Sequence, residues 1–361
     1  MMPFKLHRIC TLMEPEKGNA FEVEGVLNPA VTRGPDGALY IFPRLVAKNN
    51  YSRIGIAKVN FNEVGDPVGV ERLGIALEPE MDYEKRPNGG GGCEDPRIAY
   101  VECVEHYIMT YTAYGPKGPR IAMARSKDLF TWERLGLVCF TPYEDVDFNG
   151  IDNKDASFFP TDLPSPHQHM SLAMLNRPLF PNTRPEEIVK NDDIHKSDQP
   201  RESIWISYFN LKKGKDTSLE NARFTSHHCL AHPEYPWENL KIGAGAPPIL
   251  TKHGWLLVYH GVQKHEDCTK DQPAFYYSAG AMILSEKKPQ KILYRSPEPI
   301  LIPDLPDERI GTVGNVVFPT GTDCRDDIGQ PNRIDVYYGM ADNRIGVAKM
   351  FIPDDLPTTR K

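Results

Sequence analysis

A set of three short segments recurs five times along the chain, and this repetition constrains the fold more than any other feature. The first segment joins proline to an apolar run, at 28–31, 94–98, 157–160, 246–250 and 316–319. The second is an apolar run that ends in aromatic or polar residues, at 38–45, 106–114, 169–178, 254–262 and 333–342. The third is rich in small and β-branched residues, at 53–59, 120–126, 204–210, 277–284 and 344–350.

The copies follow one another at intervals of roughly 65 to 85 residues and always keep the same internal order. A unit of this length with three or four strands is typical of a propeller blade. We therefore predict an all-β fold, a five-bladed β-propeller in which residues 1–361 form a single catalytic domain. A large β-sandwich with accidental similarity between its strands is the alternative.

The composition agrees with an ordinary soluble protein built from short strands. Hydrophobic residues make up 40% of the 361 residues, and 33 prolines and 28 glycines are spread throughout. No apolar run approaches the ~18 residues that a membrane helix needs. The first twenty residues lack the apolar core of a secretory signal, so we expect a cytoplasmic protein without membrane contact.

Charge and cysteine content narrow the classes of partner. The net charge of -7 argues against nucleic-acid binding, which usually needs a basic face. The seven cysteines are scattered and never form a CxxC pair, which predicts neither a disulfide framework nor a zinc site. His227, His228 and Cys229 are adjacent, and successive residues of a strand point to opposite faces, so a shared metal is not expected there.

Two polar stretches, 181–203 and 211–222, lengthen the third unit. They are poor in apolar residues, so we expect surface loops, with a short helix in the first. Such loops could overhang a central pocket, contact another subunit of a homo-oligomer, or be solvated insertions.

The glycine-rich stretch NGGGGCEDPRI (88–98) is the strongest candidate for chemistry. Consecutive glycines permit an unusual turn or a close approach of the backbone to another group. They lead directly to Glu94, Asp95 and Arg97. In a propeller the first strand of each blade lines the central axis. Asp95 is therefore either an acid in a central site or part of a structural Asp-Pro turn.

Other units place polar groups at equivalent points, so one shared site is expected. These groups are Arg44, Ser52, Asn153, Lys154, Asp155, Asn176, Arg177, Tyr259, His260, Tyr337, Tyr338 and Asp342. Aromatic rings suit the faces of sugars, and clustered Arg and Lys suit phosphate or carboxylate groups.

The chain resembles glycoside hydrolase family 130, the β-mannoside phosphorylases and mannosidases. The motifs that carry the resemblance are GVLNPAV (25–31), YSRIGIA (51–57), GCEDPRI (92–98), YTAY (111–114), DLFTWERLG (128–136), NKDASFFP (153–160), GAGAPPI (243–249), GWLLVYHGV (254–262), SPEPIL (296–301), GNVVFP (314–319) and YYGMADNRIGVA (337–348). The resemblance covers nearly the whole chain and implies a five-bladed β-propeller, in agreement with the repeat count.

The resemblance implies an inverting reaction with Asp95 as general acid, its proton passing through the mannose 3-hydroxyl to the glycosidic oxygen. In a phosphorylase, inorganic phosphate then attacks the anomeric carbon and α-mannose 1-phosphate forms. The implied phosphate contacts are Arg44, Lys154, Arg177 and Asn176. The implied contacts to the β-mannoside oligosaccharide are Asn28, Ser52, Arg97, Tyr111, His260 and Asp342. No metal or organic cofactor is implied.

One departure leaves a hydrolase open. Phosphorylases of the family commonly have LHRP where this chain has LNRP, so Asn176 replaces a histidine expected to contact phosphate. An inverting hydrolase needs a second carboxylate as base. Glu144, Asp145, Asp147 and Asp155 are the candidates. We favour β-1,2- or β-1,4-mannoside phosphorolysis, with an inverting β-mannosidase as the alternative and a non-catalytic sugar-binding propeller as the competitor from another class.

Overall fold

The computed structural model describes residues 3–86, 89–144, 147–180, 201–211, 218–220, 222–264 and 275–357. These residues form an all-β protein, as predicted, with a few short helical turns. In the described part of the chain, no helix has the length and apolar character needed to cross a membrane. The two expected insertions fall largely outside the described residues.

Most strands belong to five antiparallel units of four strands each. We call the first strand of each unit the inner strand and the fourth the outer strand, and the strands are given in that order. Unit 1 is β2 (Gly25–Arg33), β3 (Leu39–Ala47), β4 (Tyr51–Phe61) and β5 (Pro67–Leu77), and unit 2 is β6 (Gly91–Val101), β7 (His106–Gly115), β8 (Gly118–Ser126) and β9 (Glu133–Leu137).

The other three units have the same form. Unit 3 is β11 (Asn153–Phe158), β13 (Met170–Pro178), β14 (Ile204–Asn210) and β15 (Arg223–Ala231), and unit 4 is β16 (Lys241–Ala244), β18 (Gly254–Lys264), β19 (Phe275–Leu284) and β20 (Ile292–Arg295). Unit 5 is β21 (Val317–Arg325), β22 (Gln330–Met340), β23 (Arg344–Phe351) and β1 (His7–Met13).

Smaller elements complete the sheets and connections. They are β10 (Cys139–Phe140), β12 (Leu163–Pro164), β17 (Ile249–Thr251), the 3₁₀ turns Asp82–Glu84, Glu102–Val104, Pro236–Glu238 and Asp326–Ile328, and the helix α2 (Pro306–Arg309). Units 1 and 2 join into one eight-stranded sheet because β4 and β6 pair in parallel. The three recurring sequence segments lie on or beside the first, second and third strands of the units, in the predicted order.

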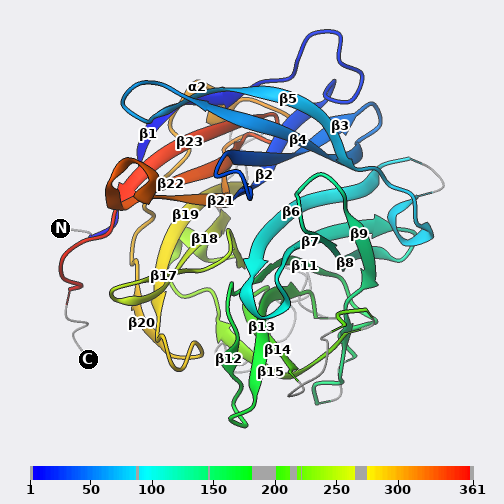
Figure 1. Cartoon of the computed structure of the whole chain (residues 1–361), viewed down its shortest axis with the longest axis vertical. Helices are drawn as coiled ribbons and strands as arrows, with labels where there is room; N and C mark the ends of the chain where they lie inside the picture. Colours follow the sequence, from blue (N-terminus) through cyan, green and yellow to red (C-terminus); the bar gives the residue numbers. More distant parts are fainter. Residues whose placement is uncertain are drawn as a thin grey trace.

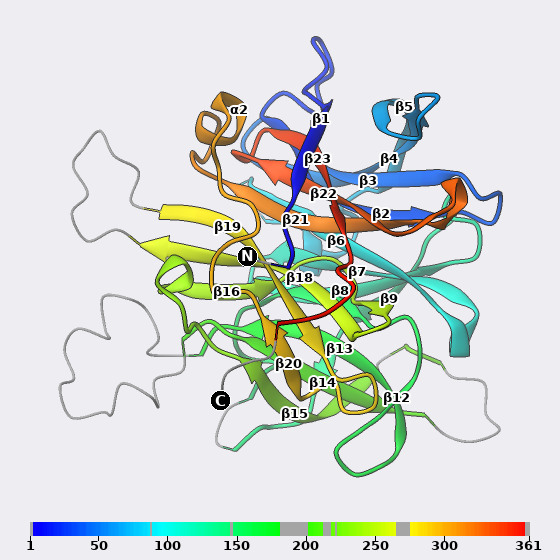
Figure 2. The ribbon, with the colours of Figure 1, turned by 90° about the vertical axis from the view of Figure 1, so that its left-hand side faces the viewer.

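The units follow one another in chain order in Figure 1, and the first and last units lie side by side. Arg33 of unit 1 bonds to Asp323 of unit 5, with Nη2 2.7 Å from Oδ2. After a quarter turn, units 5 and 1 lie at one end of the molecule and β13, β14 and β15 of unit 3 at the other (Figure 2).

The hydrophobic core is divided among the contacts between neighbouring units. Five buried clusters lie between units 1 and 2, 2 and 3, 3 and 4, 4 and 5, and 5 and 1. The last of these brings Val26 and Ile41 of unit 1 against Tyr337 and Val347 of unit 5. Each unit therefore buries apolar side chains against both of its neighbours.

A buried glutamate stands before the inner strand in three units and binds the same kinds of partner each time. Glu84, Glu238 and Glu308 are fully buried. Each accepts two backbone N–H bonds from the residues that precede its own helical turn. Each also accepts the hydroxyl of a second-strand tyrosine and pairs with an arginine of the outer strand. The partners are Tyr111 and Arg134, Tyr259 and Arg295, and Tyr338 and Arg8.

The other two units vary this arrangement. In unit 1, Glu22 precedes β2 and pairs with Arg72 of β5 at 2.8 Å, and no tyrosine of the described part of the chain bonds to it. In unit 3 an amide replaces the carboxylate, since Asn149 hydrogen-bonds to both the N–H and the carbonyl of Phe140. Each connection is thus tied to strands of the unit that it enters.

This arrangement predicts an unequal effect of two neighbouring glutamates on stability. Arg295 pairs with the buried Glu238 and with Glu234, whose side chain is 54% exposed. Glu238→Ala should lower the free energy of unfolding by about 3 kcal/mol, because it leaves Arg295 with only the exposed Glu234 as a carboxylate partner and removes the buried acceptor of the Tyr259 hydroxyl and of two backbone N–H groups. The matched control Glu234→Ala should cost less than about 1 kcal/mol. Urea denaturation followed by fluorescence measures both, and equal losses would contradict the assignment.

Candidate active site

Three inner strands contain a residue with left-handed backbone at corresponding places. These residues are Asn28 in β2, Asp95 in β6 and Asp155 in β11, with φ of 44°, 47° and 54°. In each strand the pairing register with the second strand shifts across this residue. Such a bulge redirects a side chain out of the regular ladder. Asn and Asp tolerate the left-handed region better than most residues, which explains their use here.

The glycine run before Asp95 serves a close backbone contact, one of the roles that the sequence suggested. Gly91 and Gly92 have φ of 76° and 110°, and they pair with Tyr51 and Ser52 of β4. A Cβ atom at Gly92 would collide with the carbonyl of Ser52. The run therefore lets β6 lie against unit 1 and brings Asp95 beside the polar groups of that unit.

Asp95 is held from two sides by unit 1. Asn28 Nδ2 donates to Asp95 Oδ1 at 2.9 Å, and Arg44 Nη1 lies 3.3 Å from the same oxygen. Arg44 is fixed in turn, because its Nη2 donates to Glu94 Oε1 at 2.9 Å and its Nε donates to Ser52 Oγ at 2.9 Å. We call Asn28, Arg44, Glu94, Asp95 and Lys154 the carboxylate cluster.

Lys154 brings a second cation to this cluster from unit 3. Its Nζ lies 3.9 Å from Glu94 Oε2 and 5.4 Å from the centre of the Tyr114 ring. Burial opposes ionisation of Asp95, but Arg44, Arg97, Lys154 and the hydrogen bond from Asn28 outweigh it and lower the pKa of this carboxyl. Asp95 is therefore a carboxylate at neutral pH in the free protein.

Asp342 of unit 5 differs from Asp95 because its pKa is raised rather than lowered. Burial raises its pKa to about 6; Arg44 opposes this rise, and the carboxylates of Asp95 and Glu94 add to it. One face of the molecule thus holds an ionised carboxyl and a second one that accepts a proton in mildly acidic solution.

A second buried group lies beside the carboxylate cluster. Asp155 Oδ2 lies 2.5 Å from Arg177 Nε and 3.6 Å from His260 Nε2, and Arg177 also pairs with Glu202. The His260 ring packs on Phe318, with 4.3 Å between centroids. Burial lowers the pKa of His260 to about 3 despite Asp155, so this histidine is neutral at physiological pH.

Arg97 connects the two groups. Its Nε donates to the carbonyl of Gly245 at 2.8 Å, and its Nη1 donates to the carbonyls of Asp95 and Pro96 at 2.9 and 3.1 Å. The guanidinium therefore clamps the left-handed turn that presents Asp95. Burial lowers the pKa of Arg97.

Both polar atoms of the Asn176 side chain are bonded within the protein, so its amide is not a free donor for phosphate. Its Nδ2 donates to Asn153 Oδ1 at 3.4 Å, and its Oδ1 accepts from Ser207 Oγ at 3.2 Å. Ser207 Oγ is also 2.9 Å from Nδ1 of His227. The asparagine that replaces the expected histidine is thus the middle of a hydrogen-bonded chain.

The predicted residues fall into three classes in the structure. The groups brought together are Asn28, Arg44, Ser52, Asp95, Arg97, Lys154 and Asp342, with Arg177 and His260 in the adjoining buried group. Asn176 bonds to Asn153, the residue before Lys154 in the chain, and to Ser207. Tyr111 was predicted to contact substrate, but it lies apart from these groups. Its hydroxyl donates to Glu84 at 2.6 Å within the core, so it supports the fold rather than facing substrate.

Among the candidate bases, Glu144 and Asp147 are exposed and Asp145 lies outside the described residues. Asp155 is buried, and although burial opposes ionisation, Arg177, His260 and Arg97 lower its pKa. Two aromatic neighbours were not singled out from the sequence: Tyr114 beside Lys154, and Phe318 beneath His260. Both lie in recognised motifs, but a motif does not show which of its rings faces the site.

The family model of glycoside hydrolase family 130, described as β-1,4-mannooligosaccharide phosphorylase, matches residues 11–356. The chain belongs to this family. A 1,2-β-oligomannan phosphorylase of Thermoanaerobacter sp. (strain X514) is 30% identical over 350 residues, which cover 95% of each chain. A β-1,4-mannooligosaccharide phosphorylase of Ruminococcus albus is 31% identical over 281 residues, covering 78% of this chain and 69% of the relative.

The fold is also shared with solved structures. One comes from a study of glycoside hydrolases within the GH130 family that target β-1,2 mannosidic linkages in Candida mannan. It superposes with a TM-score of 0.71 and 22% identity, covering 99% of this chain and 97% of its own. The family model and the relatives confirm the family resemblance inferred from the motifs.

The raised pKa of Asp342 predicts a pH-dependent contribution to stability. Because the folded protein binds this proton more tightly than the unfolded chain, stability should fall as pH rises from about 3.8 to about 6. In Asp342→Asn this contribution should be absent. Urea denaturation of both proteins from pH 4 to pH 7 measures it, and parallel stability profiles would contradict the assignment.

Proposed function

We propose that this protein is an inverting β-mannoside phosphorylase built as a five-bladed β-propeller, with inorganic phosphate as co-substrate and no metal or organic cofactor. The observation that carries the proposal is the carboxylate cluster. It holds Asp95 between the amide of Asn28 and the guanidinium of Arg44, with Lys154 nearby. The relatives named as β-1,2- and β-1,4-mannoside phosphorylases support this activity.

Two features support the propeller arrangement. The chain contains five four-stranded units, and its core clusters join each unit to the next and the last to the first. The inner strands then converge, and Asn28, Asp95 and Asp155 present polar side chains at their bulges. A central position for Asp95 follows from this arrangement.

Asp95 is ionised in the free protein and must be protonated to act as an acid, and phosphate binding provides a way to protonate it. The positive charges of Arg44, Arg97 and Lys154 keep its pKa low in the free protein. A phosphate dianion bound by Arg44 and Lys154 would neutralise much of this field, and a nearby negative charge raises a carboxyl pKa. Phosphate binding would thus place the nucleophile and favour protonation of the acid at the same time.

In the proposed reaction, the proton of Asp95 passes through the mannose 3-hydroxyl to the glycosidic oxygen as the bond to the anomeric carbon breaks. A phosphate oxygen attacks that carbon from the opposite face. The products are α-mannose 1-phosphate and a sugar shortened by one residue. Phosphate supplies the nucleophile, so no second carboxylate is needed as base.

An inverting β-mannosidase is the second candidate, and one observation favours it. Three of the four residues predicted to hold phosphate are engaged within the protein. Arg44 is bonded to Glu94 and Asp95, Arg177 is paired with Asp155 and Glu202, and Asn176 bonds to Asn153 and Ser207. Lys154 is held least tightly, since its Nζ lies 3.9 Å from Glu94 Oε2, which makes Lys154 the decisive residue for this choice.

The role of Asp95 is tested by Asp95→Asn. Asparagine keeps the left-handed backbone but cannot donate the acid proton, so turnover of β-1,2-mannobiose and β-1,4-mannobiose should fall by about 10²- to 10⁴-fold. The melting temperature should stay close to that of the unmodified protein. A folded variant with unchanged turnover would exclude Asp95 as the acid and leave a different catalytic group to be found.

The role of Lys154 is tested by Lys154→Met with phosphate as the varied substrate. Loss of a charged contact should raise the KM for phosphate by about tenfold or more, because such contacts contribute about 1.5–3 kcal/mol. Lys252→Met is the control, since this lysine pairs with the exposed Asp354. Mannose 1-phosphate should appear only when phosphate is present. Free mannose released at the same rate without phosphate would favour the hydrolase.

A further inference from the structure

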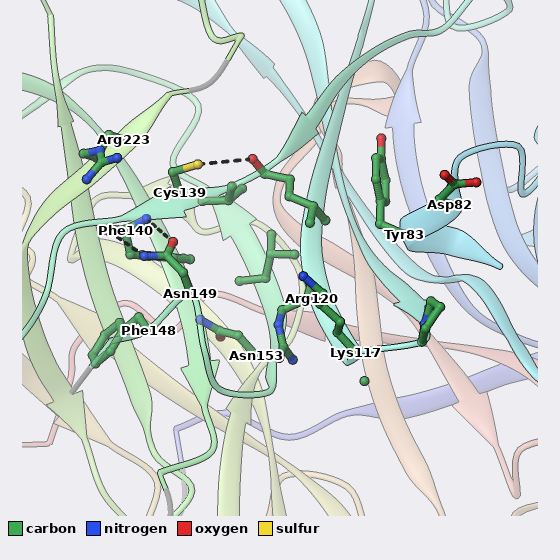
Figure 3. Close-up of a pocket in the computed structure, with 16 residues that line it drawn as sticks. Asp82, Tyr83, Lys117, Arg120, Cys139, Phe140, Phe148, Asn149, Asn153 and Arg223 are labelled. Atoms are coloured by element: carbon green, nitrogen blue, oxygen red, sulfur yellow. Dashed lines mark hydrogen bonds between the residues drawn. The ribbon is translucent and has the colours of Figure 1, made fainter. Parts of the chain in front are cut away.

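A cavity of about 520 Å³ lies between units 2 and 3, outside the carboxylate cluster. Its walls come from β8, β9, β10 and the adjoining turns (Figure 3). Most of the lining is apolar and includes Tyr83, Ile121, Leu137, Val138, Phe140 and Phe148. The exposed side chains of Asp82, Lys117 and Arg223 form its rim.

The cavity adjoins the proposed reaction centre. Asn153 and Gly115 line it, and they directly precede Lys154 and directly follow Tyr114. Lys154 and Tyr114 contact each other at the edge of the carboxylate cluster, with 5.4 Å between Nζ and the ring centre. On each strand, a residue that lines the cavity is therefore the direct sequence neighbour of a residue at the edge of the group that holds Asp95.

Almost all polar side chains within the cavity already have partners in the protein. Arg120 bonds to Asp152 and to the carbonyl of Pro119. Asn149 bonds to the backbone of Phe140 and to Asp147. Asn149 has no donor left for the hydroxyls of a sugar, and Arg120 already donates three bonds within the protein. A sugar placed here would leave hydroxyl groups unpaired against apolar walls, which costs free energy.

Asn153 is the exception. Its side chain is 1% exposed, and its Nδ2 has no hydrogen-bond partner among the residues that the structure describes. Its Oδ1 is held by Asn176, which is held by Ser207, so the amide cannot turn without breaking this chain. Figure 3 draws Asn153 among the lining side chains, near Asn149 and Arg120. An unpaired buried donor is satisfied most simply by an acceptor oxygen of a ligand.

We propose that this cavity binds an apolar aglycone, an aryl or alkyl group attached through oxygen to a mannosyl residue at Asp95, with Asn153 Nδ2 donating to an oxygen at the start of the aglycone. The volume lies within the usual range for small-molecule sites, and mostly apolar walls with one directed donor are typical of them. The assignment rests on the proposed β-mannoside activity. It also gives Asn176 a role, which is to orient Asn153.

Binding to the inactive Asp95→Asn protein tests the proposal without turnover. Calorimetry compares methyl, benzyl and octyl β-D-mannopyranosides, which share one sugar and differ in apolar area. Benzyl and octyl mannoside should bind at least about tenfold more tightly than methyl mannoside, as burial of several carbon atoms implies. Equal dissociation constants for the three would overturn the proposal.

Two further variants in the same background locate the effect. Leu137→Trp should fill the cavity and bring the three dissociation constants together, while Leu293→Trp, on the exposed side of β20, should leave the preference intact. Asn153→Asp keeps the volume but removes the donor, and because the three mannosides share the bonded oxygen, it should weaken all of them by about fivefold or more. A preference that survives Leu137→Trp, or binding that is unchanged in Asn153→Asp, would place the aglycone elsewhere.

The outcome is separable from that of the proposed function. If mannobiose and phosphate yield mannose 1-phosphate but the three mannosides bind equally, the activity stands and the aglycone site fails. If the apolar mannosides bind more tightly and no mannoside is turned over by the unmodified protein, the aglycone site stands and the proposed reaction fails.

Discussion

The buried glutamate before the inner strand is the interaction on which the other parts of the structure depend. The chain must leave the last strand of one unit and enter the first strand of the next. Glu84, Glu238 and Glu308 hold this connection by binding its backbone and two strands of the unit ahead. A buried carboxylate with this many donors is satisfied only in one geometry, so it sets where the inner strand begins in these three units.

The site follows from that placement. In three of the five units, a bulge near the start of the inner strand turns a side chain out of its ladder. Asn28, Asp95 and Asp155 occupy such bulges, and the second strands contribute Arg44, Arg177 and His260 near their ends. Cations and carboxylates from different units thus meet, although hundreds of residues can separate them in the chain. Their close balance decides which carboxyls are ionised.

Much of this could be predicted from the sequence because the repeated segments carry local information. Short apolar runs, prolines and glycines at regular intervals indicated the strands, and the EDPR motif indicated Asp95. The glutamate arrangement was missed because its partners lie far apart; Arg8 and Glu308 are 300 residues from each other. Tyr111 was misassigned for a related reason. Its motif predicted a strand end near the site, but strand position alone does not decide which face of the sheet an aromatic residue occupies.

The left-handed backbone at Asp95 has a consequence for how this architecture can evolve. Few residues accept that conformation, and asparagine and glycine are foremost among them. The codons of both differ from those of aspartate by one nucleotide. A single point mutation can therefore remove the carboxylate while the bulge, the clamp of Arg97 and the surrounding units persist. Descent from an enzyme to a protein that only binds its sugar would need no unstable intermediate.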